Sequence, residues 1–351
     1  MLLSLPPLRS VLSHSASFKH AHRTMTTLAV EIQRQGGPEV LEVREIPKPT
    51  PTPTQVLVRN EFCGANYIDT YHYSGLYPLK CPVVIGQESA GVVEQVGEMV
   101  QKLKVGDRVV SYGAGSYAQH RVVDENIPVR IPDGIDTRMA AASYLQGLTA
   151  LTLIREAYPV QKGDYVLVTA AAGGVGLLLC QMASAVGAHV IGTVSTEAKA
   201  ELARANGAEH ALIYHAERLD ELVAQVDKIT GGKGCQGIFD GVGKDTWEAS
   251  FEMIARKGTI VTFGNASGAV PAFTPLKLAG KNVKVCRPTL FNYITTSEER
   301  ETYSAELFDM IQSGKVKIHV HDEYPFTTEG IRKALADIKS RATTGKLIVK
   351  L

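Results

Sequence analysis

The sequence predicts an α/β protein with two domains, one rich in β-strands and one built on a doubly wound parallel sheet. A chain of 351 residues is long enough for two domains that each bury a core. Residues 30–118 alternate short apolar stretches with Gly/Pro turns, which is typical of β-strands. After Thr149 apolar strands alternate with helical segments, and this βαβ repetition predicts a parallel sheet with right-handed crossovers.

The first 24 residues differ in composition from the rest. They contain Arg9, Lys19 and Arg23 together with several serines, and the first acidic residue of the chain is Glu31. This composition resembles a mitochondrial presequence. A disordered tail is the alternative, because Pro6 and Pro7 interrupt any amphipathic helix. We therefore expect a cytoplasmic protein, or a mitochondrial one if residues 1–24 act as a presequence.

Charge and cysteine content exclude several classes of function. The 37 Lys and Arg residues nearly balance 36 Asp and Glu residues, so the net charge of +1 creates no field that attracts nucleic acid or an anionic membrane. The five cysteines are scattered and form no CxxC pair, which is more typical of a reduced protein than of a disulfide scaffold. No apolar run reaches the roughly 18 residues needed to span a bilayer.

The segment from Gly163 to Ser184 predicts a dinucleotide site. An apolar strand at residues 165–168 is followed by a turn of small residues and then by an apolar helix. A helix that begins at such a turn directs free N–H groups and the positive end of its dipole toward a phosphate. The candidate pyrophosphate-binding residues are Ala172, Gly173, Gly174, Val175 and Gly176.

The same segment resembles the quinone oxidoreductase and zeta-crystallin branch of the medium-chain dehydrogenase/reductases. Segments 64–78, 192–199, 242–248, 262–268 and 340–347 are also similar to that family. The resemblance implies a GroES-like β-rich catalytic domain, formed by residues 25–148 and 289–351. It also implies a Rossmann NADP-binding domain over residues 149–288.

The loop after the second strand of the parallel sheet predicts which dinucleotide binds. NAD enzymes place a carboxylate about 20 residues after the glycine turn, where it binds the ribose 2′-OH. Here residues 192–195 contain no carboxylate, and Ser195 and Lys199 are better suited to a 2′-phosphate. Glu197 is the opposing observation. The resemblance adds Tyr214 and, more weakly, Arg341 to this phosphate site, so we expect NADPH.

The chain lacks the expected ligands of a catalytic zinc ion. Zinc-dependent relatives would place a histidine in a Gly-His-Glu motif and a cysteine at the position of Asn66, whereas this chain has Gln87 in the motif. His319 and His321 share a strand face but have no evident third ligand. We therefore expect an enzyme without metal, whose substrate accepts hydride without a Lewis acid. Quinones fulfil this condition.

Aromatic residues near the expected nicotinamide suit a planar acceptor. The resemblance implies that Tyr71 contacts the nicotinamide and the substrate, and that Asn66 and Tyr77 line the quinone slot, whereas Tyr67 is expected only to pack. It also implies cofactor contacts from Thr149, Phe263, Gly264 and Asn265. The predicted function is NADPH-dependent quinone reduction. The alternatives are a 2-alkenal or enone reductase and an AU-rich RNA-binding or crystallin-like structural protein.

The apolar run Val283 to Cys286 is expected to be an edge strand of the parallel sheet. Pairing across a two-fold axis would cover such an edge. A homodimer is therefore expected, as the resemblance also implies.

Overall fold

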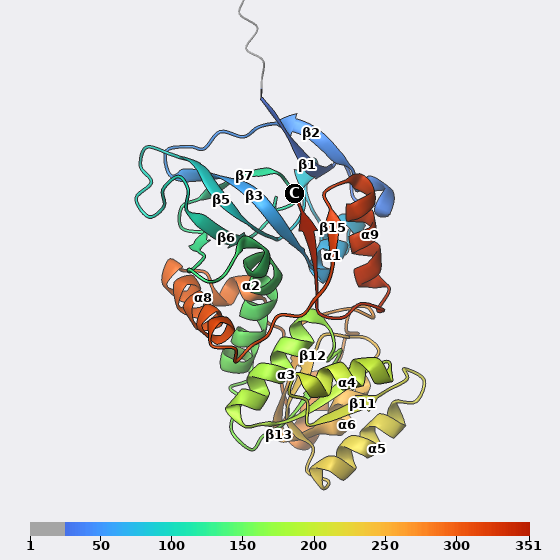
Figure 1. The fold of residues 1–351 in the computed structure, drawn as a ribbon. Helices are drawn as coiled ribbons and strands as arrows, with labels where there is room; N and C mark the ends of the chain where they lie inside the picture. Colours follow the sequence, from blue (N-terminus) through green and yellow to red (C-terminus); the bar gives the residue numbers. More distant parts are fainter. Residues whose placement is uncertain (1–24) are drawn as a thin grey trace, which may run out of the picture.

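The computed structural model describes residues 25–351, and these residues form two units that each contain a large sheet (Figure 1). The presequence interpretation of residues 1–24 lies outside the described residues. The two units together confirm the predicted α/β class, with a β-rich unit and a parallel-sheet unit.

The β-rich unit contains a small and a large sheet. The small sheet has the order β2-β1-β4, and the large sheet includes β3, β5, β6 and β8, with β7 paired to β3. Its elements are β1 (Thr26–Ile32), a 3₁₀ turn (Pro38–Val40), β2 (Val43–Pro47), β3 (Gln55–Ala65), α1 (Tyr67–Ser74), β4 (Val83–Val84), β5 (Glu88–Val96), β6 (Arg108–Tyr112), β7 (His120–Asp124) and β8 (Val129–Arg130).

The parallel-sheet unit has six strands in the order β11-β10-β9-β12-β13-β14, and all their pairings are parallel. Its elements are β9 (Tyr165–Val168), α3 (Gly174–Val186), β10 (His189–Val194), α4 (Glu197–Ala205), β11 (His210–Ile213), α5 (Leu219–Thr230), β12 (Cys235–Asp240), α6 (Trp247–Met253), β13 (Ile254–Thr262), a 3₁₀ turn (Pro275–Lys281) and β14 (Lys284–Cys286). The strand order reverses between β9 and β12, and doubly wound sheets bind dinucleotides at the carboxyl ends of strands at such a point.

The C-terminal part of the chain returns to the β-rich unit. It consists of α7 (Leu290–Tyr293), α8 (Ser297–Gln312), β15 (Val320–Pro325), α9 (Thr328–Lys339) and β16 (Lys346–Lys350). Strand β16 pairs antiparallel with β3, so that Leu347 lies opposite Ala65. Strand β15 pairs parallel with β16. The last strand of the chain is therefore an interior strand of the large sheet, between the edge strand β15 and β3.

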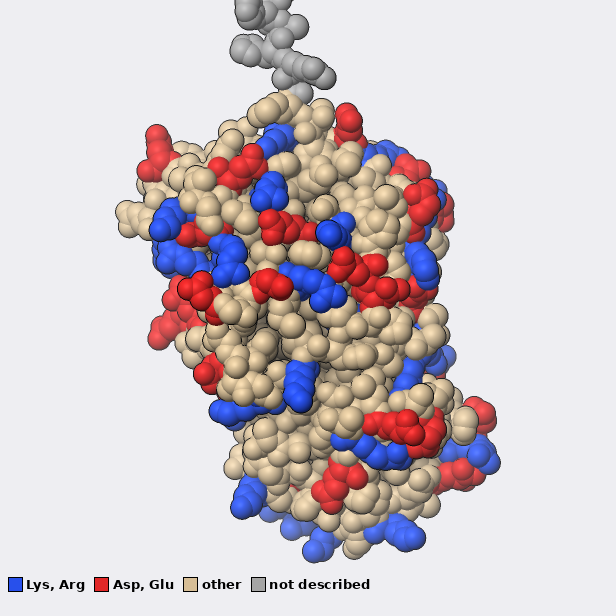
Figure 2. All heavy atoms as spheres, in the orientation of Figure 1, with Lys and Arg blue, Asp and Glu red and all other residues tan. Residues whose placement is uncertain are grey.

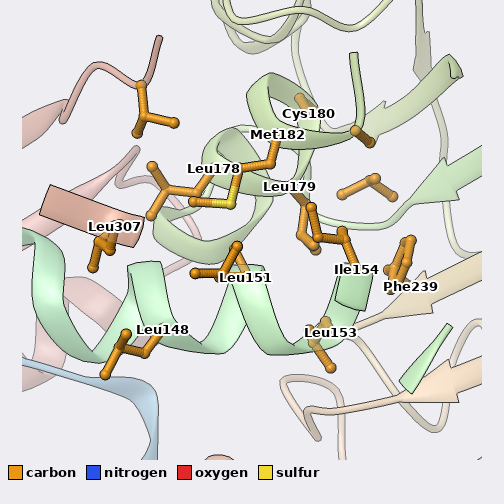
Figure 3. Close-up of a cluster of buried hydrophobic side chains, with 14 of the residues drawn as sticks. Leu148, Leu151, Leu153, Ile154, Leu178, Leu179, Cys180, Met182, Phe239 and Leu307 are labelled. Atoms are coloured by element: carbon orange, nitrogen blue, oxygen red, sulfur yellow. The ribbon is translucent and has the colours of Figure 1, made fainter. Parts of the chain in front are cut away.

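Helix α2 (Thr137–Thr152), which a π-helical turn (Leu153–Ala157) follows, joins the two units. It contacts β3, β5, β6 and β16 of the large sheet and also α3 and α8. Figure 3 shows Leu148 and Leu151 of this helix within the same apolar cluster as Leu178 of α3 and Leu307 of α8. The boundary expected between residues 148 and 149 falls inside α2, because one apolar helix packs against both units.

The visible surface carries both signs of charge. Figure 2 shows Lys and Arg side chains interspersed with Asp and Glu side chains, without a large field of one sign on that face. Within residues 25–351, no helix has the length and apolar character needed to cross a membrane.

Candidate active site

The glycine-rich turn lies at the carboxyl end of β9, beside the point where the strand order reverses. Helix α3 starts at Gly174, and Gly173 caps it with extended backbone, at φ −77° and ψ 174°. The first N–H groups of a helix have no intrahelical acceptor. With the helix dipole they provide a site that suits a pyrophosphate, and Val175 and Gly176 belong to this first turn.

The glycines of this turn have different roles. A Cβ atom at Gly174 would lie 2.2 Å from Oε1 of Gln146, and one at Gly176 would lie 2.3 Å from the carbonyl oxygen of Ala170. At Gly173 the nearest atom would be 3.2 Å away. Gly176 is therefore required by its close approach to the backbone, whereas a side chain at Gly174 would displace the amide of Gln146. Gly173 is the least crowded of the three positions.

The residues expected at the 2′-phosphate lie around the carboxyl end of β10. Ser195 follows β10 and is exposed, and Tyr214 follows β11, with its N–H donating to the carbonyl of Val194 at 3.1 Å. The ammonium of Lys199 donates a hydrogen bond to the carbonyl oxygen of Arg341. Partial burial lowers the pKa of Lys199 from its ordinary value. The structure thus brings Lys199 and Arg341 together although 142 positions separate them.

Glu197, the acidic residue near this site, is engaged elsewhere. Its carboxylate accepts a hydrogen bond from Arg204 Nη1 at 2.8 Å on the same helix. The Arg204 guanidinium therefore offsets part of the charge that would oppose a phosphate at Ser195 and Lys199.

Three tyrosines from α1 and the loop after it form an aromatic group. The ring centroids of Tyr67 and Tyr71 are 5.5 Å apart, and those of Tyr71 and Tyr77 are 5.2 Å apart. The hydroxyl of Tyr71 accepts the N–H of Asn265 at 3.0 Å, and the hydroxyl of Tyr67 donates to the carbonyl of Ala266 at 3.1 Å. Tyr67 therefore does more than pack, because it also ties α1 to the loop after β13.

Burial raises the pKa of Tyr71 to about 12. The phenol therefore remains protonated at neutral pH, and its oxygen is already an acceptor for a backbone N–H.

Arg287, which sequence analysis did not single out, joins this group. Its Nη1 donates to the carbonyl of Thr262 at 2.7 Å, and its Nη2 lies 3.4 Å from the hydroxyl of Tyr77. With its amide oriented so that both ends are satisfied, Asn265 accepts a further hydrogen bond from Arg287 Nη2 at 3.1 Å. Arg287 follows β14 directly. Its place at the carboxyl end of a parallel strand, where ligands bind in such sheets, is the signal that could have identified it.

Asn66 lies in a buried polar network, where both ends of its amide are hydrogen-bonded. Its side chain is 3% exposed, its Oδ1 accepts from Lys346 Nζ at 2.7 Å, and its Nδ2 donates to Glu88 Oε2 at 3.0 Å. The buried ion pair of Glu88 and Lys346 thus engages both ends of the amide. That Asn66 lines the quinone slot stays a prediction.

The other positions tested for zinc also have partners within the protein. Gln87 is buried, and its Nε2 lies 3.5 Å from Nδ1 of His72. His319 and His321 both contact the hydroxyl of Thr344, at 3.0 and 3.2 Å. Among residues 25–351, no group of three or more His, Cys, Asp or Glu side chains is placed to hold a metal ion.

The remaining expected cofactor residues lie on two elements beside the turn. Thr149 is on α2, where its hydroxyl donates to the carbonyl of Leu145 at 2.7 Å. Phe263 and Gly264 follow β13, and the N–H of Phe263 donates to the carbonyl of Asp240 at 2.9 Å. A Cβ at Gly264 would lie 2.4 Å from the carbonyl oxygen of Gly241, so this glycine permits the two loops to meet.

Asp69 is a buried carboxyl in the first turn of α1. Its Oδ2 accepts hydrogen bonds from the hydroxyl of Tyr117 at 2.7 Å and from the N–H of Asn66 at 2.9 Å. Burial raises its pKa to about 7 in spite of these hydrogen bonds. The folded protein therefore keeps this proton to a higher pH than the unfolded chain does.

Stability should consequently fall as the pH rises from about 4 to about 7. In that window the folded state binds more protons than the unfolded state, so Asp69 contributes a slope of up to about 1.4 kcal/mol per pH unit. Above this window the contribution is constant. Urea unfolding at pH 5, 6, 7 and 8 measures the slope, and Asp69→Asn should flatten it. Equal slopes for the variant and the wild type would contradict this assignment.

Comparisons with known proteins agree with the geometry. Residues 52–133 match the family described as alcohol dehydrogenase GroES-like domain, and residues 174–312 match the family described as zinc-binding dehydrogenase. A probable quinone oxidoreductase of Schizosaccharomyces pombe is 45% identical over 330 residues, which cover 93% of this chain and 97% of that protein. A 2-haloacrylate reductase of a Burkholderia species is 35% identical over 335 residues, which cover 92% of this chain and 98% of that protein.

A solved structure extends the similarity to the whole fold. The Escherichia coli quinone oxidoreductase complexed with NADPH has a TM-score of 0.88 and 40% identity, covering 93% of this chain and 100% of that chain. Both units and the order of their elements therefore have counterparts in that protein. Similarity of this extent shows that the chain belongs to the quinone oxidoreductases of the medium-chain dehydrogenase/reductase superfamily.

Proposed function

We propose that this protein reduces quinones with NADPH. The observation that carries the proposal is the aromatic group of Tyr67, Tyr71 and Tyr77, which hydrogen bonds from Tyr67 and Tyr71 tie to the loop after β13. Aromatic walls with a few polar tips suit a planar acceptor. The quinone oxidoreductase names of the similar proteins support the same activity.

The residues around the phosphate turn fit NADPH. The N-terminus of α3 and the less crowded backbone at Gly173 would hold the pyrophosphate. Ser195, Lys199 and Arg341 would hold the 2′-phosphate, and Tyr214 lies beside them. When bound, NADPH would supply a hydride or electrons from its nicotinamide. The complex of the similar Escherichia coli enzyme with NADPH supports this choice of cofactor.

The residues at the other end of the site would align the acceptor and favour its reduction. The ring of Tyr71 forms a wall that Tyr67 and Tyr77 support. Reduction leaves negative charge on a quinone oxygen, and the guanidinium of Arg287 brings a positive charge to this part of the site. Because the pKa of Tyr71 is raised to about 12, its hydroxyl can donate a hydrogen bond but gives up its proton reluctantly. Solvent then protonates the product.

A substrate panel tests the proposal. Purified protein with NADPH should reduce ortho- or para-quinones, reduce a 2-alkenal more slowly, and oxidise simple alcohols undetectably. Activity should persist in a chelator and elemental analysis should find no stoichiometric zinc, because Asn66 and Gln87 replace the expected ligands. Faster oxidation of alcohols than reduction of quinones would refute the assignment. One zinc ion per chain would refute the metal-free mechanism.

Neither alternative function is favoured. The relative named as a haloacrylate reductase is less similar than the relative named as a quinone oxidoreductase. An RNA-binding role has no support from the net charge of +1. RNA that shifted in a gel and was displaced by NADPH would revive it.

We infer a homodimer that pairs through β14. This strand is at the edge of the six-stranded sheet, and the neighbouring Phe273 and Leu276 are 39% and 80% exposed. Covering an unpaired edge and these apolar side chains favours a second copy. Light scattering should give twice the chain mass. Leu276→Glu should shift the protein toward the monomer, and monomer mass for the wild type would contradict the inference.

The cellular location is proposed from the sequence alone. The protein would be cytoplasmic, or mitochondrial if residues 1–24 are a presequence. A fluorescent protein fused behind residues 1–24 would enter mitochondria only in the second case.

A further inference from the structure

A buried ion pair, Glu88 and Lys346, lies between the phosphate turn and α1. Lys346 Nζ is 2.6 Å from Glu88 Oε2, and the two side chains are 1% and 0% exposed. We propose that this pair is a positioning device for hydride transfer, which fixes α1 and Tyr71 relative to the phosphate-binding turn. The inference rests on the proposed quinone reduction.

The pair holds the residue from which α1 begins. Asn66 precedes α1, and it accepts from Lys346 Nζ at 2.7 Å while donating to Glu88 Oε2 at 3.0 Å. Its backbone N–H donates to Asp69 in the first turn of the helix. Both charges therefore act on the start of α1, and Tyr71 lies little more than one helical turn further on.

One connection leads from Lys346 to the phosphate turn. The preceding residue, Gly345, donates its N–H to the carbonyl of Ala172 at 2.9 Å. Gly345 has a φ of +55°, and a Cβ there would lie 2.2 Å from the carbonyl oxygen of His319. Only glycine fits this position. Its hydrogen bond to Ala172 holds the backbone next to Lys346 against the phosphate turn.

A second connection leads from Glu88 through α2. Glu88 Oε1 accepts the N–H of Leu145 at 2.6 Å. The next residue, Gln146, packs against Gly174, where a Cβ would lie 2.2 Å from its Oε1. The carbonyl of Leu145 accepts the hydroxyl of Thr149, a candidate cofactor contact. The carboxylate thus anchors the part of α2 that supports the start of α3.

Charges suit this role better than apolar side chains would. A buried ion pair adds little stability compared with apolar packing, so stability alone does not explain its presence. Charge-assisted hydrogen bonds do fix direction and distance. A displacement of about 1 Å between reacting groups can lower a rate about 100-fold, so this precision matters most for the alignment of the nicotinamide with the quinone.

The decisive variant carries Glu88→Gln and Lys346→Met together, which removes both charges and leaves no buried charge unpaired. We expect kcat for the quinone to fall about tenfold or more, with the Kd of NADPH within about threefold of wild type. The primary deuterium isotope effect with NADPH labelled at the transferred hydrogen should rise, because hydride transfer becomes slower relative to other steps. The control is Lys48→Met with Glu94→Gln, which removes a 2.7 Å pair outside the site and should leave these quantities unchanged.

Amide hydrogen exchange supplies a readout that does not depend on turnover. In the wild type, NADPH should slow exchange both at the phosphate turn and in residues 66–74. In the double variant the protection of the turn should persist and that of residues 66–74 should be lost. If the wild type reduced no quinone, the proposed function would fail, and this exchange pattern would still decide the inference.

Two results would overturn the inference. One is a double variant with wild-type kcat and wild-type protection of residues 66–74. The other is a parallel loss of kcat, NADPH affinity and thermal stability, which is the mark of a purely structural pair. If the double variant does not fold, Asn66→Ala, which keeps both charges and removes the link to α1, decides by the same readouts.

Discussion

Replacing Tyr71 with alanine should lower kcat/KM for the quinone about 10- to 100-fold, because the ring that aligns the acceptor is lost. Tyr71 is 9% exposed, and its ring lies 5.2 Å from that of Tyr77, so the substitution removes one wall of the proposed slot. Steady-state kinetics at saturating NADPH measure the effect.

Tyr71→Phe is the matched control. It keeps the ring and removes only the oxygen that accepts the N–H of Asn265. One hydrogen bond contributes about 1 kcal/mol, so the loss should be about fivefold. If phenylalanine were as harmful as alanine, the hydroxyl and not the ring would be the important group. Equal activity of Tyr71→Ala and wild type would exclude Tyr71 from the site.

Replacing Lys199 with alanine should raise the KM for NADPH about tenfold or more and leave the KM for NADH almost unchanged. A hydrogen bond to a charged group contributes about 1.5–3 kcal/mol, and NADH lacks the phosphate that would receive it. The substitution also removes the contact of Lys199 with the carbonyl of Arg341. Both effects act at the 2′-phosphate end of the site.

Lys228→Ala provides the control, since Lys228 is an exposed lysine on α5 of the same unit. It should change neither KM. A wild-type preference for NADH, or an equal rise in KM for both cofactors with Lys199→Ala, would contradict the proposed role of Lys199.

Arg287 shows why part of the site escaped sequence analysis. The side chain is 210 positions from Tyr77 in the sequence, and it reaches the hydroxyl of Tyr77 only because the segments after β14 and after α1 meet in the folded chain. A lone arginine in an apolar neighbourhood carries no pattern by itself. The glycine-rich turn was recognisable because strand, turn and helix are consecutive there.

The sequence shows that Asn66 stands where zinc-dependent relatives have a cysteine, and this observation needs only the local sequence. The engagement of Asn66 by Glu88 and Lys346 depends on β16, which begins 280 positions later and pairs with β3. Strand pairing over such a distance is a property of the fold, so no spacing rule could predict it.

The sequence by itself determined the α/β class and the dinucleotide turn, because strand and helix periodicity and the turn residues are local features that need no tertiary contact. The family followed from the resemblance of several segments to known proteins, which the comparisons confirmed. Only the tertiary structure decided which glycines serve packing, that α2 joins the two units, and that Arg287 and the buried ion pair belong to the site. These features arise where segments distant in the sequence pack against one another. The free energies of these contacts depend on burial and on distances of a few ångströms.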